Sequence, residues 1–323
     1  MGSPNSVPAM SRSFKALAVA AAAGMYLVQL MGALVTKSGS AEGCGASWPL
    51  CDGSFLPAAN IHSIIEYSHR AVSGIVGILV FAFAYYVWRR YPARSDARYL
   101  GLVGAIFVII QSALGAAAVL WPQPKTVLAL HFGISLTAFA AVLLPTVILF
   151  QLERGTTHRR TPVSAALRNW AWVSLIYVYA VVYSGAYVRH TNSHLACLDW
   201  PLCGGALIPE LSGSVGIQFF HRLAAGVSLL VLFYLFRLAA RERESRPDVY
   251  RGAAIALALI VAQVLSGAHV VLSHLTLTAM MLHSAVITAL FGVLSYICLQ
   301  VSREPSPADA RPVGTVSPAG ART

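Results

Sequence analysis

The sequence predicts an all-α integral membrane protein with eight transmembrane helices, arranged as two parallel four-helix repeats. Three observations support this fold class. The chain of 323 residues is 57% hydrophobic and 11% charged, whereas an average soluble domain has about a quarter of its residues charged. It contains eight apolar segments of membrane-spanning length, and a set of polar residues recurs at a fixed spacing in its two halves. Together these features exclude an ordinary soluble domain.

Each apolar segment is long enough to cross a hydrocarbon layer of roughly 30 Å as a helix. The predicted spans cover residues 14–36, 64–88, 99–121, 127–151, 168–188, 217–236, 252–272 and 277–300. The first segment lacks an obvious cleavage site, so we expect it to remain as the first helix.

Polar residues recur in the same order in both halves of the chain. Pairs separated by 152 positions are His69 and His221, His131 and His283, Gln111 and Gln263, and Cys51 and Cys203. Each half holds an even number of predicted spans, so both copies begin on the same side of the membrane. Repeats of this kind pack around an axis along the membrane normal.

The repeat divides the chain into two halves with connecting and terminal segments. The predicted parts are a cytoplasmic N-terminal segment (1–13), an N-terminal four-helix half (14–153), a cytoplasmic linker (154–167), a C-terminal four-helix half (168–300) and a disordered cytoplasmic tail (301–323).

The basic residues follow the predicted spans. The net charge is +11, but its distribution indicates a membrane protein rather than one that binds nucleic acid. With the N-terminus in the cytoplasm, 18 of the 23 Lys and Arg residues lie inside. Only Lys37, Lys125 and Arg189 lie outside, and the remaining two, Arg70 and Arg222, lie within predicted spans. This asymmetry fits the positive-inside rule. We therefore expect a multi-pass protein of the bacterial plasma membrane, with cytoplasmic termini and extracytoplasmic cysteine loops.

Two predicted outer loops each carry a cysteine pair. The outer face of a bacterial membrane is oxidising, which favours a disulfide in each pair, Cys44 with Cys51 and Cys197 with Cys203. The alternative is one zinc site made by four thiolates from both loops. The fifth cysteine, Cys298, lies in the last span, where it fits a small buried apolar residue.

Two histidines in each half lie near the outer leaflet at matching depths. A histidine inside a span is costly and usually faces the bundle interior, and helix packing does not require one at four equivalent positions. Helices carrying His69 and His131 can bind a haem iron between two imidazoles, and those carrying His221 and His283 can bind another. The sequence thus predicts two bis-histidine haem sites.

An arginine follows the first histidine of each pair. Arg70 and Arg222 lie near the outer interface, where a guanidinium group can pair with haem propionates. The alternative is that both side chains extend to the membrane surface to keep their charge in water.

One position breaks the repeat in a way that bears on chemistry. Glu66 corresponds to Gln218 and lies three residues before His69, so the two side chains share a helix face. A carboxylate beside a haem can exchange a proton or stabilise positive charge. We infer that the first half carries out chemistry and that the second holds a resident haem that transfers electrons. The alternative is a Glu66 that only pairs with Arg70.

These motifs resemble those of the haem A synthase family. The matching strings are Val35 to Ser40, the Cys44 to Cys51 loop ending in Trp48-Pro49-Leu50-Cys51, Glu66-Tyr67-Ser68-His69-Arg70, and Gly185 to Thr191. The resemblance covers residues 14–300 and is closest to the bacterial type with two cysteine-bearing outer loops.

The resemblance implies an eight-helix enzyme that oxidises the methyl group at porphyrin position 8 of haem O to a formyl group through an alcohol intermediate, with water as the source of the formyl oxygen. It implies that His69 and His131 flank haem O with Glu66 as the catalytic carboxylate, and that His221 and His283 ligate haem b. Haem O synthase and an unidentified electron acceptor would be its partners, and the oligomeric state is left open.

Two other functions compete with this interpretation. A bis-histidine di-haem b cytochrome would only transfer electrons. Both ligand pairs lie at one depth, which argues against an electron path across the membrane, and the difference between Glu66 and Gln218 argues against equal roles for the two haems. A duplicated transporter would not explain the outer cysteine pairs.

Overall fold

The computed structural model describes residues 10–155 and 161–303, and this part of the chain is helical. Its helices are α1 (Arg12–Lys37), α2 (Ile61–Arg90), α3 (Ser95–Leu120), α4 (Lys125–Glu153), α5 (Ala165–His190), α6 (Gly213–Arg241), α7 (Pro247–Leu272) and α8 (Leu277–Ser302). All eight are long and apolar enough to cross a membrane. The predicted all-α membrane fold class is therefore confirmed.

The predicted spans agree closely with these helices. Each span lies within one helix, except that Trp121 caps α3 rather than ending it. Most of the predicted N-terminal segment and nearly all of the predicted tail lie outside the described residues. The division of the chain into domains stays a prediction.

Polar side chains begin several helices. The side chains of Ser11, Asn60 and Ser164 accept hydrogen bonds from backbone N–H groups in the first turns of α1, α2 and α5. Such caps satisfy donors that have no partner within the helix. Pro247 occupies the start of α7, where its missing N–H costs no hydrogen bond.

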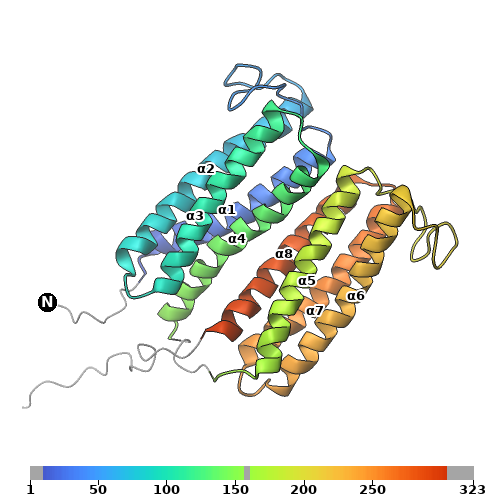
Figure 1. Cartoon of the computed structure of the whole chain (residues 1–323). Helices are drawn as coiled ribbons and strands as arrows, with labels where there is room; N and C mark the ends of the chain where they lie inside the picture. Colours follow the sequence, from blue (N-terminus) through green and yellow to red (C-terminus); the bar gives the residue numbers. More distant parts are fainter. Residues whose placement is uncertain (1–9, 156–160, 304–323) are drawn as a thin grey trace, which may run out of the picture.

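The helices form two bundles with separate cores (Figure 1). One apolar cluster joins α1 to α4 and includes Phe14, Val80 and Leu149. A second joins α5 to α8 and includes Leu167 and Leu294. Each half of the chain therefore buries its own apolar surface.

A third, smaller cluster lies between the bundles, in the region we call the seam. Leu136 and Ala140 of α4 pack there with Val182 of α5 and Phe291 of α8. Hydrogen bonds also cross the seam. The Tyr26 hydroxyl donates to the carbonyl of Ala285 over 3.0 Å.

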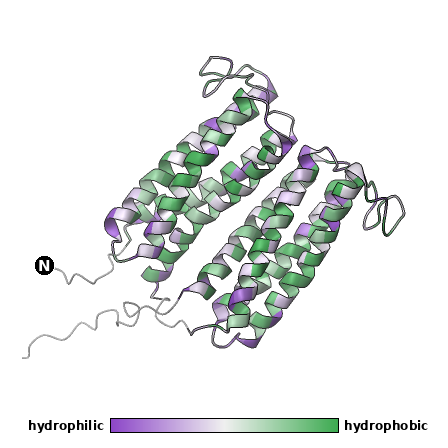
Figure 2. Cartoon of the chain, in the orientation of Figure 1, coloured by the Kyte–Doolittle hydropathy of each residue, from purple (hydrophilic) through white to green (hydrophobic). Residues whose placement is uncertain are grey.

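Hydrophobic residues predominate along most of the length of the helices (Figure 2), and many large apolar side chains are exposed. Ile78 of α2 is 70% exposed and Leu230 of α6 is 69% exposed. A soluble monomer rarely leaves so much apolar surface in water, so lipid is the environment that fits this surface.

Both cysteine loops lie at the same end of the molecule (Figure 1), one between α1 and α2 and the other between α5 and α6. Contacts recur at the spacing of the sequence repeat. Arg94, which precedes α3, forms an ion pair with Asp96 in the first turn of that helix. Arg246 and Asp248 form the equivalent ion pair at the start of α7. Matched contacts of this kind are expected if the two halves arose by duplication.

Candidate functional site

Each of the four candidate haem-ligating histidines packs against a glycine on the preceding helix. The pairs are Gly32 with His69, Gly115 with His131, Gly185 with His221, and Gly267 with His283. A Cβ atom at Gly185 would lie 2.8 Å from Cε1 of His221, and one at Gly267 would lie 3.3 Å from Cε1 of His283. The missing side chains thus provide the space that the imidazole rings fill.

The C-terminal histidines have hydrogen-bond partners that fix their tautomer. Ser184 Oγ lies 2.8 Å from Nδ1 of His221 and donates to the carbonyl of Val181 over 2.7 Å. Because the hydroxyl proton is used on that carbonyl, the serine oxygen accepts a hydrogen bond from the Nδ1–H group of His221. The Nε2 atom of His221 is then left unprotonated, which is the form that ligates iron.

His283 is held in the same way by a different helix. Ser266 Oγ lies 2.9 Å from its Nδ1 and donates to the carbonyl of Gln263. The Gln263 amide nitrogen lies 3.1 Å from Nε2 of His283, which suits an Nε2 that accepts. Both C-terminal rings therefore carry an unprotonated Nε2. In His283 the lone pair of this atom accepts from the Gln263 amide, and an iron bound there would replace that hydrogen bond.

The N-terminal histidines are held more loosely. Ser73 Oγ lies 3.5 Å from Nδ1 of His69, at the limit of a hydrogen bond. Nδ1 of His131 is buried without a partner, and the Gln111 amide donates to the backbone carbonyl of His131 rather than to its ring. The two bundles thus offer histidine pairs of unequal rigidity.

These residues fit a haem. The rings of His69 and His131 interact electrostatically, as do those of His221 and His283, so each pair shares one region of its bundle. Among the described residues, no group of three or more His, Cys, Asp or Glu side chains could hold a metal ion. Two imidazoles suit an iron whose other ligands come from a porphyrin.

The structure joins both predicted cysteine pairs as disulfides, Cys44–Cys51 and Cys197–Cys203. No thiolate remains in either loop for the alternative zinc site. Cys298 is free and buried.

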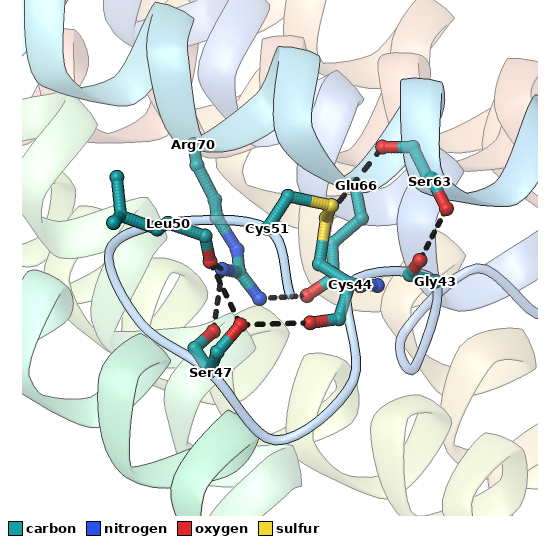
Figure 3. A network of polar contacts seen from close by, with 8 residues as sticks. All are labelled: Gly43, Cys44, Ser47, Leu50, Cys51, Ser63, Glu66 and Arg70. Atoms are coloured by element: carbon teal, nitrogen blue, oxygen red, sulfur yellow. Dashed lines mark hydrogen bonds and ion pairs between the residues drawn. A yellow bond between two sulfur atoms is a disulfide. The ribbon is translucent and has the colours of Figure 1, made fainter. Parts of the chain in front are cut away.

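Glu66 and Arg70 hold the first cysteine loop against α2 (Figure 3). Glu66 Oε2 accepts a hydrogen bond of 2.9 Å from the backbone N–H of Cys44, and its other oxygen pairs with Arg70. Arg70 Nη1 donates to the carbonyls of Ser47 and Leu50, each over 2.7 Å. The ion pair considered from the sequence is therefore present, and the buried Glu66 carboxylate contacts the disulfide loop directly.

Gln218 and Arg222 anchor the second loop without an ion pair. Gln218 Oε1 accepts from the N–H of Cys197 over 2.5 Å, and its amide donates to the carbonyl of His194 over 2.9 Å. Arg222 donates to the carbonyls of Cys197, Asp199 and Leu202, each over 2.8 Å. The two anchors share the same hydrogen bond to the first cysteine, and the main difference between them is the charge on Glu66.

Two further polar side chains, His62 and Asp199, also have hydrogen-bond partners at the loops. His62 Nδ1 lies 3.0 Å from the Ser40 hydroxyl, in an exposed position on α2. Asp199, in the second loop, accepts from the N–H groups of Gly205 and Gly204, each over 2.8 Å. These two hydrogen bonds lower the pKa of the Asp199 carboxyl below its usual value.

Sequence reasoning missed the serine partners and the role of the glycines. Ser184 and Ser266 correspond to Met31 and Leu114 in the first half, so these serines are not part of the sequence repeat. The glycines do repeat, Gly115 and Gly267 at a spacing of 152 and Gly32 and Gly185 at 153, and their position one helix before each histidine was the available signal.

Comparison with known proteins adds independent findings. Residues 15–295 match the model of a family described as cytochrome oxidase assembly protein. The chain is 47% identical over 300 residues to a protein named "Heme A synthase" from Symbiobacterium thermophilum, covering 91% of this chain and 98% of that relative. It is 41% identical over 314 residues to a protein of the same name from Geobacillus kaustophilus, covering 96% of this chain and 99% of the relative.

Proposed function

We propose how this chain, a membrane enzyme of the cytochrome oxidase assembly protein family that makes haem A from haem O, carries out the conversion. The conversion turns the methyl group at porphyrin position 8 into a formyl group through an alcohol. Water supplies the oxygen, and four electrons and four protons leave the methyl carbon and the water. The electrons pass to an acceptor outside the chain that is not yet identified.

The unequal rigidity of the two histidine pairs is the observation that carries the assignment of roles. A substrate must enter and its product must leave, whereas a cofactor stays bound. We therefore assign haem O to His69 and His131, whose rings have few partners, and haem b to His221 and His283, whose Nδ1 atoms contact Ser184 and Ser266. When bound there, haem b supplies one-electron oxidation and reduction.

Glu66 is the candidate catalytic carboxylate. It is 3% exposed, it lies one helical turn from His69, and its counterpart Gln218 is equally buried but uncharged. We propose that its carboxylate accepts protons released during oxidation and stabilises positive charge on the substrate. Its hydrogen bond to Cys44 also keeps the disulfide loop beside this site.

The Glu66→Gln variant separates charge from anchoring, because Gln218 already shows that an amide can accept the N–H of the first cysteine. We expect this variant to keep its loop and its haem b but to make no haem A. Glu66→Ala, which removes the acceptor, should lose activity and also expose the Cys44–Cys51 disulfide to reductant. Normal haem A production by Glu66→Gln would remove the carboxylate from the mechanism.

The function itself is tested by extracting and separating the haems of cells that make haem O, with and without this protein. We expect haem A, or its alcohol precursor, only when the protein is expressed. Haem O left unchanged during aerobic growth, with haem b bound to the purified protein, would instead support the di-haem cytochrome.

The proposed location is the bacterial plasma membrane, with both cysteine loops on the outer side and the termini in the cytoplasm. The apolar surface and the position of both loops at one end of the molecule support it. Haem O synthase, as the supplier of the substrate, is the partner that this chemistry calls for.

A further inference from the structure

Two basic side chains meet at the seam, at the end of the molecule that carries the cysteine loops. Lys37, the last residue of α1, donates to the carbonyl of Met280 over 2.6 Å and to the hydroxyl of Ser284 over 2.5 Å, both on α8. Arg189 of α5 donates through Nη2 to the carbonyl of Thr36 over 2.9 Å. Three helices from both bundles are thus joined around two positive charges.

No carboxylate balances these charges within the part of the chain that the structure describes. The ion pairs found there involve neither Lys37 nor Arg189. The two cations are close enough to repel each other, and the Nε atom of Arg189 is buried without an acceptor. Both side chains are half-buried. Partly desolvated charge without a counter-charge is costly, so this arrangement calls for an anionic ligand.

The neighbouring histidine, His194, adds a further polar group to this region but no negative charge. His194, in the second cysteine loop, has a pKa lowered by burial and then by the charge of Arg189. Its ring is therefore neutral near pH 7, and its Nδ1 atom is buried without a partner. The region contains several donors but no anion of its own.

The position of Lys37 indicates which ligand the cations meet. Ser284, its partner, directly follows His283, and the Lys37 charge acts on the His283 ring. A haem held by His221 and His283 carries two propionate carboxylates, and ammonium and guanidinium groups form strong charge-assisted hydrogen bonds with carboxylates.

The arginines predicted to bind propionates are engaged elsewhere. Arg70 and Arg222 donate to the carbonyls of the cysteine loops, and Arg70 also pairs with Glu66. Their donors hold loop backbone, whereas Arg189 has a buried donor with no acceptor.

We propose that Lys37 and Arg189 form a carboxylate-binding site at the seam, and that it holds a propionate of the porphyrin bound between His221 and His283. The resident haem is then bound by both bundles, with its iron ligands from the C-terminal bundle and a propionate contact from α1 of the other. This inference relies on the proposed function only for the presence of a haem in the C-terminal bundle.

Lys37→Met tests the site, since methionine keeps most of the side-chain volume and removes the charge. Lys125→Met is the matched control, because Lys125 is an exposed lysine at the start of α4. The measurements are the haem b retained per purified chain and the midpoint potential of that haem. We expect Lys37→Met to weaken haem retention roughly tenfold, the effect of losing one charge-assisted hydrogen bond, and to lower the midpoint potential, because a nearby cation favours the reduced haem.

Lys37→Arg keeps the positive charge and should retain haem near the level of the unaltered protein. This result would show that haem loss in Lys37→Met comes from the missing charge and not from misfolding caused by any substitution at this position. Retention and potential equal to those of Lys125→Met would overturn the proposal. A loss of bound anionic phospholipid from Lys37→Met, with an unchanged haem potential, would assign the site to a lipid headgroup and also overturn it. None of these measurements uses haem A production, so they stand apart from the test of the enzymatic function.

Discussion

At the level of single residues, the hydroxyl groups beside the C-terminal histidines distinguish the ligand pair of one bundle from that of the other. Ser184 and Ser266 each donate to a backbone carbonyl and accept from a histidine Nδ1. Residues of this kind around a metal site set the tautomer and orientation of the ligand. The first half has Met31 and Leu114 at the corresponding positions, which cannot do so.

Removing these hydroxyls should weaken the resident haem. We expect Ser184→Ala and Ser266→Ala each to lower the haem b content of the purified protein by about tenfold or more, the usual cost of losing such a partner. The absorption spectrum and the haem-to-protein ratio report the result. Ser73→Ala, at the 3.5 Å contact with His69, should leave haem b unchanged and serves as the control.

The glycines that face the histidines predict a graded series. A Cβ would lie 2.8 Å from the ring at Gly185, 3.3 Å at Gly267 and 3.8 Å at Gly115. We expect Gly185→Ala to displace His221 and lose most haem b, and Gly267→Ala to lose less. Gly115→Ala, which faces His131 in the other bundle, is the control and should leave haem b unchanged. Equal haem contents in the three variants would show that the ring positions do not depend on these contacts.

Residue-level prediction from the sequence succeeded where positions repeat. The cysteine pairs recur in both halves and are joined in the structure. Ser184 and Ser266 do not recur in the first half. Each contacts a histidine on the following helix, so no short sequence motif links the serine to its partner. Glu66 was found because it breaks the repeat, but its bond to Cys44 depends on the path of a loop that spacing does not determine.

At the level of helices, close packing at the seam depends on a small residue. Gly133 of α4 lies directly against the ring of Tyr183 on α5, and a methyl group there would overlap that ring. The Tyr183 hydroxyl in turn donates to Tyr179 over 2.8 Å, and Tyr179 contacts Thr137 of α4. This contact sets how closely α4 and α5 approach each other.

Gly133→Ala should therefore destabilise the protein by about 1–3 kcal/mol, the range for overpacking a well-filled interior. The unfolding temperature in detergent is the measurement. Gly77→Ala is the matched control, because a Cβ at this buried glycine of α2 would make only an ordinary contact of 3.7 Å with Val108. A similar unfolding temperature for both variants would contradict the expected overlap.

The extents of the helices were the most predictable part of the fold. A membrane span needs about 20 apolar residues, and hydropathy shows such runs directly. Which helices meet was less accessible, because apolar composition is similar on all faces. The contact of Lys37 with α8, more than 240 residues further along the chain, could not be read from the sequence.

At the level of the whole molecule, the distribution of basic residues predicts which side each end faces. After reduction frees the outer loops from their disulfides, a membrane-impermeant maleimide applied to spheroplasts should label cysteines of both loops. Cys298 lies in the apolar core of the C-terminal bundle, within the span of α8, and should stay unlabelled. Without reductant neither loop should react. Labelling of the loops only after the membrane is permeabilised would reverse the orientation.

The separate cores of the two bundles bear on how such a protein could arise. Two identical subunits related by an axis must change together, since one gene encodes both, so a carboxylate gained at one site appears at the other. Once the copies are fused into one chain, each can vary alone. Glu66 and Gln218 occupy one such pair of positions, and Lys37 and His190 another. A paired ancestor with two equal sites could thus become a chain whose two halves carry different residues at equivalent positions, as the proposed division of roles between them requires.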